Sequence, residues 1–358
     1  MKHLKRLKIL NFYSEFERFI QDSKKGRRLQ PNGMRLSVGT VDNYRFTLTL
    51  VQKFCEAKSF ELRIKPASWL NSRELEVECN YWKKFYRQFT NYLYQDCGYF
   101  DNYVGLTIKN VRTFFNYLKK GRIPGIGDFH KQFYVRKEEI GIFPLMPEEL
   151  SFLVHDENFE QSLKKRMKEV KDFFVFGCTV ALRFSDLNSL QKNNVRNVNG
   201  IHYLAVRSKK TATDTLIKLP SYAVSIIMRY AKLKKRLLPK FNAVNLNKFI
   251  KRLLERAGFT QPVILFRNKR GQTIELINDK KENKLFRFCD IATTHTMRRT
   301  AITTMLSLGM SEQVVRKISG HSPNSKEFYR YVLWSQTYQD KEIELMHEKL
   351  KNIASHVA

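Results

Sequence analysis

Residues 295–300 read His-Thr-Met-Arg-Arg-Thr, and they are the most informative stretch of this sequence. Residues three or four positions apart on a helix share a face, so an imidazole and a guanidinium fork could grip one phosphate together. Gly320-His321 follows, and then the basic run Phe328-Tyr329-Arg330-Tyr331. A tyrosine that reached the same phosphate would be a nucleophile, and the cationic donors would stabilise the transition state. The pattern predicts covalent chemistry on a phosphodiester.

The charge of the chain indicates a polyanionic partner. The 358 residues include 65 Lys and Arg but only 34 Asp and Glu, which gives a net charge of +31. Such an excess favours phosphate contacts and counterion release, and it is far beyond what solubility requires. No segment is long and apolar enough to span a membrane. We therefore expect double-stranded DNA as the partner, and no membrane.

The sequence indicates neither a metal site nor a cofactor. The cysteines show no CxxC pairing, which argues against a zinc site and a disulfide framework. We find no phosphate-binding loop and no carboxylate cluster suited to magnesium. The apolar run at the N-terminus is too short for a signal peptide, so we expect a cytoplasmic protein. The five cysteines are Cys55, Cys79, Cys97, Cys178 and Cys289.

The first third of the chain is predicted to be helical, because apolar side chains recur there at helical spacing. Four such stripes are expected to face a core, and the second begins behind a possible cap at Ser37. The segment 121–127 then breaks the pattern with three glycines and a proline. We expect a helical DNA-binding domain at 1–125, a linker at 126–142 and a catalytic domain at 143–358. The stripes begin with Phe12, Val41, Trp82 and Ile108.

The rest of the chain mixes helices with a small sheet. Residues 194–198, 201–206 and 214–219 are predicted strands, and Asn199-Gly200 between the first two is a strong hairpin signal. The second turn carries Lys209 and Lys210. The fold class is therefore mainly α with a small antiparallel β-sheet. Helices are expected after Pro147, from Phe173 to Arg183, from Tyr222 through the basic stretch to Arg236, and around His295 and Ser311.

These motifs, taken in order, resemble the tyrosine recombinase or phage integrase family. Residues 181–187 (Ala-Leu-Arg-Phe-Ser-Asp-Leu) resemble its first arginine motif, and Lys210-Thr211 its lysine site. Residues 295–298 match HxxR, residues 319–322 match the GH element, and residues 330–332 match the segment of the terminal nucleophile. Each match alone is weak, but five in order are strong. The resemblance implies the catalytic set Arg183, Lys210, His295, Arg298, His321 and Tyr331.

Two positions keep an alternative. His321 and Tyr331 are separated by one residue more than the family's commonest spacing, whereas Tyr329 lies one residue short. We expect Tyr331 to be the nucleophile, because the aromatic, variable and basic residues before it resemble family members from mobile elements. Tyr329 is expected to be a half-buried packing residue on the same helix. Lys209 remains an alternative to Lys210.

Each residue type suits a step of DNA transesterification. Arg183 and Arg298 would offer guanidinium forks to the nonbridging oxygens, with Asp186 orienting the first of them. Lys210 is a candidate general acid for the departing 5′ oxygen. His295 would accept the tyrosine proton or bind the phosphate, and His321 would hydrogen-bond a phosphate oxygen. Tyr331 would form a 3′-phosphotyrosyl link that conserves the bond energy.

The expected function is therefore site-specific recombination of DNA, as the integrase of a mobile element that integrates or excises. The resemblance further implies a homotetramer on paired sites, and an accessory DNA-bending protein could assist it. Two alternatives remain: a type IB topoisomerase that relaxes DNA as a monomer, and a non-catalytic DNA-binding protein with the same fold. The DNA sequence of the target site does not follow from the amino-acid sequence, because only a few side chains in a groove determine the base contacts.

Overall fold

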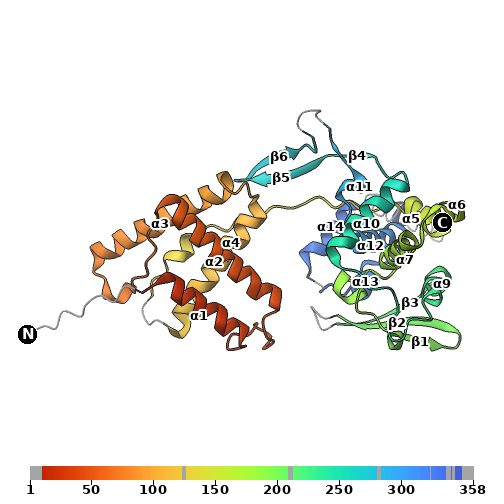
Figure 1. Cartoon of the computed structure of the whole chain (residues 1–358), viewed down its shortest axis with the longest axis horizontal. Helices are drawn as coiled ribbons and strands as arrows, with labels where there is room; N and C mark the ends of the chain where they lie inside the picture. The colour runs from red at the N-terminus through yellow and green to blue at the C-terminus, as the bar shows by residue number, and fades with distance from the viewer. Residues whose placement is uncertain are drawn as a thin grey trace, which may run out of the picture. The chain divides into compact units, whose positions relative to one another are not determined.

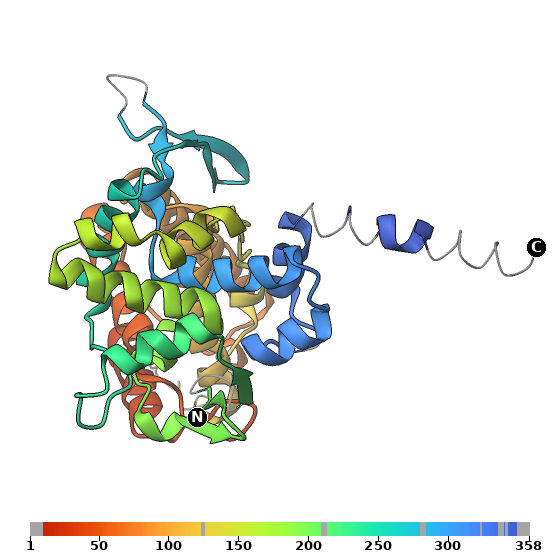
Figure 2. The same ribbon diagram turned by 90° about the vertical axis from the view of Figure 1, so that its right-hand side faces the viewer.

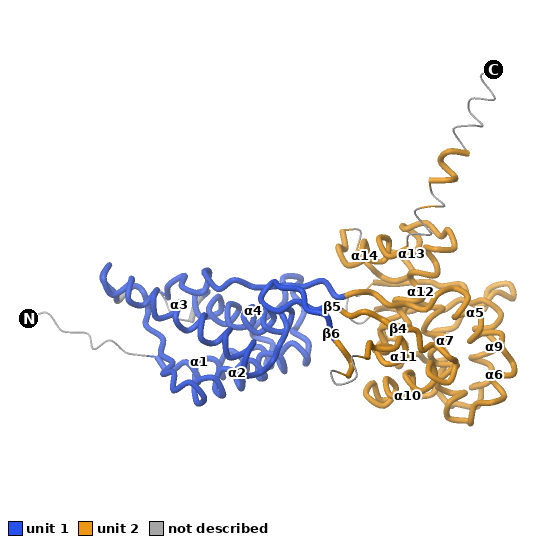
Figure 3. The backbone as a smooth tube through the Cα atoms, turned by 90° about the horizontal axis from the view of Figure 1, so that it is seen from above, with its two compact units in different colours: residues 1–140, 266–276 blue, residues 141–265, 277–358 orange. Residues whose placement is uncertain are grey.

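The chain folds mainly into helices with small antiparallel sheets (Figure 1), which confirms the predicted fold class. The computed structural model describes residues 10–122, 126–208, 213–279, 284–322, 324–335, 340 and 343–348. Contacts divide the chain into two compact units (Figure 3). Unit 1 comprises residues 1–140 and 266–276, and unit 2 comprises residues 141–265 and 277–358. Residues 266–276 thus belong to unit 1, although they lie within the predicted catalytic domain.

Unit 1 is built from four helices around an aromatic core. Ser37 accepts a hydrogen bond from the Thr40 backbone N–H, so the predicted cap is present. The four predicted stripes are buried, because aromatic rings on α1, α3 and α4 pack edge-on against one another. The helices are α1 (Phe12–Lys24), α2 (Val38–Lys58), α3 (Ser72–Gln95) and α4 (Asp101–Tyr117), with short turns η1 (Ala67–Trp69), η2 (Leu118–Arg122) and η3 (Phe129–Gln132).

A hairpin from much later in the chain completes unit 1. Strands β5 (Leu265–Lys269) and β6 (Gln272–Leu276) are joined by Arg270-Gly271, both with positive φ. The Asp101 carboxylate accepts hydrogen bonds from both turn N–H groups, each at 2.8 Å. The Glu138 carboxylate accepts from the Arg267 guanidinium at 2.7 Å. Two buried carboxylates of the N-terminal segment therefore fix this hairpin.

Unit 2 contains a three-stranded antiparallel sheet and helices that surround α7 and α12, which pack against each other (Figures 1 and 2). The predicted Asn199-Gly200 turn is confirmed, with φ of 51° and 79°. The strands are β1 (Val195–Val198), β2 (Ile201–Arg207), β3 (Asp214–Lys218), β4 (Pro262–Val263) and β7 (Phe286–Arg287).

The helices predicted for unit 2 are present, but two of them end earlier than predicted, and the helix Ala243–Arg256 was not predicted. The helix through Phe173 stops at Val180 rather than Arg183, because Ala181 adopts a left-handed conformation. The helix from Ser221 stops at Arg229, because the chain from Lys235 pairs with residues 190–192. These helices are α5 (Pro147–His155), α6 (Glu157–Ser162), α7 (Lys165–Val180), α8 (Phe184–Leu187), α9 (Ser221–Arg229), α10 (Ala243–Arg256), α11 (Phe288–Ile291), α12 (Thr294–Ser307), α13 (Glu312–Ser319) and α14 (Lys326–Trp334).

Residues 343–348 form a further helical turn after α14 (Figure 2). Among the described helices, none has the length and apolar character that a membrane crossing requires.

The contact between Glu138 and the β5–β6 hairpin predicts a substitution that destabilises unit 1. Glu138→Ala leaves the Arg267 guanidinium and the Asn268 N–H without their acceptor, and breaking a buried ion pair costs about 3–5 kcal/mol. Hydrogen exchange over α4 and the hairpin should report this loss. Asp96→Ala is the control, because it removes an ion pair to Lys58 that solvent reaches, worth at most about 1 kcal/mol. Equal protection in the two variants would contradict the prediction.

Candidate active site

The side chain of Arg298 lies almost fully buried in α12, with 6% of its surface exposed. Its Nη1 donates to the Ala181 carbonyl at 2.8 Å, and its Nη2 donates to Nε2 of His321 at 3.1 Å. Burial lowers the pKa of Arg298 to about 10, and the nearby charge of Arg183 adds to this effect. The guanidinium remains charged at neutral pH, and two acceptors fix its direction.

A glycine lets α12 approach closely enough for this contact. A Cβ built at Gly177 in α7 would lie 2.6 Å from Sδ of Met297 and 3.0 Å from Cδ2 of Leu187. Any side chain at position 177 would push Met297 away, and Arg298 follows Met297 in the same helix. The close contact between α7 and α12 at Gly177 therefore also sets the position of Arg298 relative to α7.

Arg183 sits at the N-cap position of α8, two residues after the left-handed Ala181. Its Nη1 donates to Oγ of Ser208 at 3.1 Å, and that hydroxyl donates to the buried carboxylate of Asp186 at 3.3 Å. The expected orientation of Arg183 by Asp186 therefore runs through a serine hydroxyl. Ser208 could not be singled out from the sequence, because short polar side chains find partners only in the folded chain.

The predicted lysine cannot be placed. Lys210 and its alternative Lys209 lie outside the described residues, between β2 and β3. Ser208, which bonds Arg183, immediately precedes them in the chain. The role of Lys210 therefore stays a prediction.

The ring of His321 lies between Ser319 and Arg298. Oγ of Ser319 donates to the Val315 carbonyl at 2.6 Å and lies 2.7 Å from Nδ1 of His321. Nη2 of Arg298 lies 3.1 Å from Nε2 and 3.3 Å from Nδ1 of the same ring. Burial, together with the charges of Arg298 and Arg183, lowers the pKa of His321 to about 3.

Both ring nitrogens of His321 have partners within the protein, because Nδ1 lies beside Ser319 and Nε2 beside Arg298. A phosphate beside the ring would add negative charge and favour the protonated imidazole. The expected hydrogen bond from His321 to a phosphate oxygen stays a prediction.

The two tyrosines of α14 face different surroundings. The ring of Tyr331 is half-buried, with its centroid 6.0 Å from that of His321, and it packs on a small cluster with Ile302 and Phe328. Tyr329 is 51% exposed, and the guanidinium of Arg316 lies 4.8 Å from its ring. The structure brings Tyr331, and not Tyr329, to the ring of His321.

His295 lies in the first turn of α12, where its side chain is exposed. The backbone N–H of His295 is capped by the Thr293 hydroxyl at 3.3 Å. His295 and Arg298 therefore share a helix, as predicted, but one side chain faces solvent and the other is enclosed. Arg299, which was expected to be structural or to touch the DNA backbone, is half-buried, and this burial lowers its pKa.

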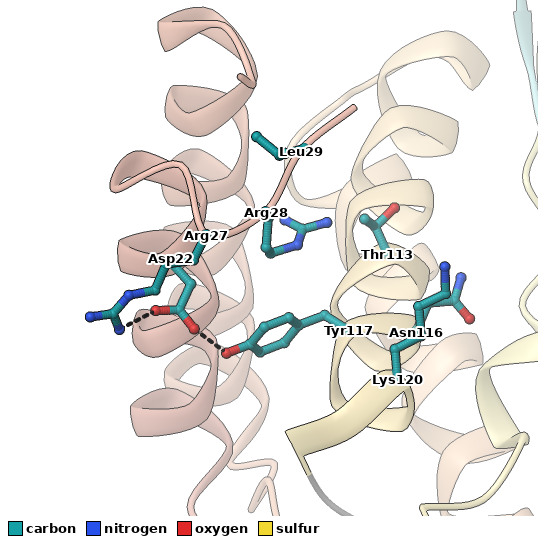
Figure 4. A pocket seen from close by; sticks show the side chains of 8 residues that line it. All are labelled: Asp22, Arg27, Arg28, Leu29, Thr113, Asn116, Tyr117 and Lys120. Atoms are coloured by element: carbon teal, nitrogen blue, oxygen red, sulfur yellow. Dashed lines mark hydrogen bonds and ion pairs between the residues drawn. The ribbon is translucent and has the colours of Figure 1, made fainter. Parts of the chain in front are cut away.

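A second feature of interest is a basic pocket in unit 1, of about 500 Å³ (Figure 4). Arg27, Arg28 and Lys120 contribute positive charge to it. Asp22 accepts hydrogen bonds from Arg27 and from the Tyr117 hydroxyl at 2.7 Å (Figure 4). The excess of cations suits a phosphate group. The pocket is lined by Asp22, Arg27, Arg28, Leu29, Thr113, Asn116, Tyr117 and Lys120.

Comparison with known proteins gives one family. The model of the phage integrase family matches residues 148–334, just over half of the chain. A structure of the Tn1549 transposon integrase with circular intermediate DNA is 16% identical, with 89% of this chain and 94% of that chain covered and a TM-score of 0.56. A λ integrase dimer bound to a COC′ core site is 13% identical, with coverages of 90% and 77% and a TM-score of 0.56.

XerH site-specific recombinase bound to difH substrate is 12% identical, with coverages of 89% and 81% and a TM-score of 0.53. Likeness at these identities shows a shared fold. No curated protein sequence matches significantly. The family match runs from α5 to the end of α14 and includes every residue of the candidate site. The chain belongs to the phage integrase family, and it is a tyrosine-type site-specific DNA recombinase.

Proposed function

We propose that the chain cleaves and rejoins DNA through Tyr331, as the integrase of a mobile element. One observation carries the assignment: within the described residues, the Tyr331 ring lies beside His321, which is itself bonded to the buried Arg298. A nucleophile, a neutral imidazole and a fixed guanidinium thus meet in one place. Tyr329 points toward Arg316 and solvent instead.

The reaction uses side chains alone to handle charge and protons. The hydroxyl of Tyr331 attacks the phosphorus, its proton passes to His295 or water, and the new Oη–P bond replaces the P–O5′ bond. Arg183 and Arg298 stabilise the charge on the nonbridging oxygens, and Lys210 protonates the departing 5′ oxygen. The phosphotyrosyl ester keeps the energy of the broken bond, so a 5′ hydroxyl can reverse the step and rejoin the strands.

Unit 1 supplies sequence-independent affinity in this proposal. The basic pocket between α1 and α4 offers Arg27, Arg28 and Lys120 to a DNA phosphate (Figure 4). The guanidinium of Arg28 is held 4.2 Å above the Phe19 ring and bonds Ser23, so it is ordered before DNA arrives. Ordered cations of this kind fix the position of a duplex without reading its bases.

The biological setting is inferred from the fold neighbours. The Tn1549 structure is that of a transposon integrase, and λ integrase has been seen as a tetramer on a Holliday junction. By analogy we assign to this chain integration or excision by a homotetramer on paired sites, with an accessory DNA-bending protein as a possible helper. A type IB topoisomerase would differ in relaxing supercoiled plasmid as a monomer at many sequences.

The assignment of the nucleophile predicts unequal effects of two similar substitutions. Tyr331→Phe should abolish the covalent protein–DNA adduct but keep duplex affinity, because it removes one hydroxyl from a surface with many phosphate contacts. Tyr329→Phe is the matched control and should retain most of the activity. The substrate is a nicked duplex whose sequence is recovered from adducts of the unaltered chain with fragmented genomic DNA. Adduct lost in the control and kept in Tyr331→Phe would move the nucleophile to Tyr329.

The proposed acid predicts a specific chemical rescue. Cleavage should proceed in excess EDTA, because arginines take the role that metal ions have in hydrolytic phosphoryl transfer. Lys210→Ala should slow cleavage, and a 5′-phosphorothiolate at the scissile bond should restore it, since sulfur leaves without a proton. Arg298→Lys should be impaired on both substrates, because an ammonium cannot form the paired fork contact. Rescue of both variants, or of neither, would remove Lys210 from this role and direct the test to Lys209.

A further inference from the structure

Helix α14, which carries Tyr331, is anchored differently at its two ends. At its C-terminal end, Oγ of the buried Ser335 lies 2.7 Å from Oγ of Ser307, the last residue of α12. At its N-terminal end, the N-cap residue Ser325 makes no side-chain capping hydrogen bond within the described part of the chain. The first turn of α14 therefore depends on contacts from another element.

Arg316 of α13 supplies contacts to this end of α14. Its guanidinium carbon lies 4.0 Å from the centroid of the Phe328 ring and 4.8 Å from that of the Tyr329 ring, both in α14. Its Nη1 donates to the Ser322 carbonyl, in the segment between the two helices, at 3.4 Å. Only 11% of the Arg316 side chain is exposed, and a cation attracts a ring most strongly where water is excluded.

Phe328 connects Arg316 with the candidate site. Its ring is fully buried, and its centroid lies 6.2 Å from that of Tyr331 and 5.4 Å from that of His321. The backbone N–H of His321 in turn donates to the Arg316 carbonyl at 3.0 Å. Arg316 therefore contacts both the segment that carries His321 and the helix that carries Tyr331.

A purely local role for Arg316 would run through its own helix. Its Nη2 donates to the Glu312 carboxylate at 3.1 Å, and Glu312 lies four residues earlier in α13. Such a pair supports α13 itself and does not involve α14. The stacked rings and the Ser322 carbonyl belong to other segments, so their loss should alter the placement of α14 and leave α13 intact.

We propose that Arg316 is a positioning residue, which holds α14 so that the hydroxyl of Tyr331 is placed for attack before the DNA strand is cleaved. This inference rests on the proposed function of Tyr331. It requires no contact of Arg316 with the phosphate or with the reacting oxygen, because the effect passes through Phe328 and the backbone of α14.

This role predicts an asymmetry between cleavage and rejoining. Before cleavage, Tyr331 is held only by packing, so a loosened α14 spends less time in the reactive position. After cleavage, the Oη–P bond itself holds the tyrosine at the phosphate. Loss of a positioning contact therefore slows cleavage but not rejoining, whereas loss of transition-state stabilisation slows both directions equally.

The test measures both directions with the full chain on the nicked duplex. Arg316→Met removes the cation but keeps an unbranched side chain. The variant should bind the duplex normally and cleave it about tenfold more slowly in a single turnover, with rejoining within about twofold of the unaltered rate. Rejoining is started by adding an oligonucleotide with a 5′ hydroxyl to the isolated adduct. Arg316→Lys keeps the charge but not the planar group, and it should show the same asymmetry with a cleavage loss of about threefold.

Glu312→Gln is the matched control, because it removes the ion pair within α13 and leaves the stacked rings and the Ser322 contact in place. Its cleavage and rejoining rates should both be unchanged. Equal slowing of the two directions in Arg316→Met, a normal cleavage rate in that variant, or slow cleavage by Glu312→Gln would each overturn the inference. If Arg316→Met does not bind the duplex or yields no adduct, Arg316→Lys takes both measurements with the same criteria.

Tyr331→Phe is assayed in parallel to keep the two proposals apart. An adduct from that variant would refute the nucleophile itself. Its absence, together with equal slowing of cleavage and rejoining in Arg316→Met, would refute only the role of Arg316.

Discussion

A guanidinium enclosed by protein is the constraint around which unit 2 is organised. Enclosing Arg298 removes its water, and the loss is offset only if acceptors stand at fixed places around it. The Ala181 carbonyl and the ring of His321 serve this purpose. The first is the carbonyl of the left-handed residue that ends α7, and the second is a ring whose pKa is lowered by burial beside Arg298 and Arg183. The end of one helix, the protonation of a histidine and the charge of an arginine thus meet at one place.

Short polar side chains carry the connections between the recognisable motifs. Ser208 joins Arg183 to Asp186, and Ser319 sets the orientation of His321. Ser319 belongs to the same motif as His321, whereas Ser208 lies outside the quoted motifs and joins two residues of the first arginine motif. The site is therefore a linked network in which the positions of the charged groups are determined together.

The sequence was sufficient for features that depend on local chemistry. The Asn199-Gly200 turn has positive φ at both positions, which asparagine and glycine tolerate better than other residues. Ser37 caps its helix through its own hydroxyl. The order of the family motifs singled out the arginines and Tyr331, whose catalytic roles stay predictions. Their mutual geometry was not predictable, because the exposure of His295 and the enclosure of Arg298 depend on what packs against α12.

Long-range contacts were the features that sequence reasoning missed. The Arg270-Gly271 turn is a weaker hairpin signal than Asn-Gly. Nothing nearby in the chain indicates that Asp101 accepts the turn N–H groups, or that Glu138 accepts from the backbone of Asn268. Likewise, α9 ends at Arg229 because the chain after it, from Lys235, pairs with residues 190–192, and the composition of α9 does not indicate this end. Patterns within a window of residues cannot report partners outside that window.

The late hairpin of unit 1 also sets an order for synthesis. The ribosome releases residues 1–140 long before residues 266–276, so the nascent unit emerges with the carboxylates of Asp101 and Glu138 lacking their partners in the hairpin. Domains generally fold as they leave the ribosome, but this one stays incomplete until most of unit 2 has been translated. Acquisition of its final stability is thereby delayed, and unit 1 is complete only when the candidate site of unit 2 is also being made.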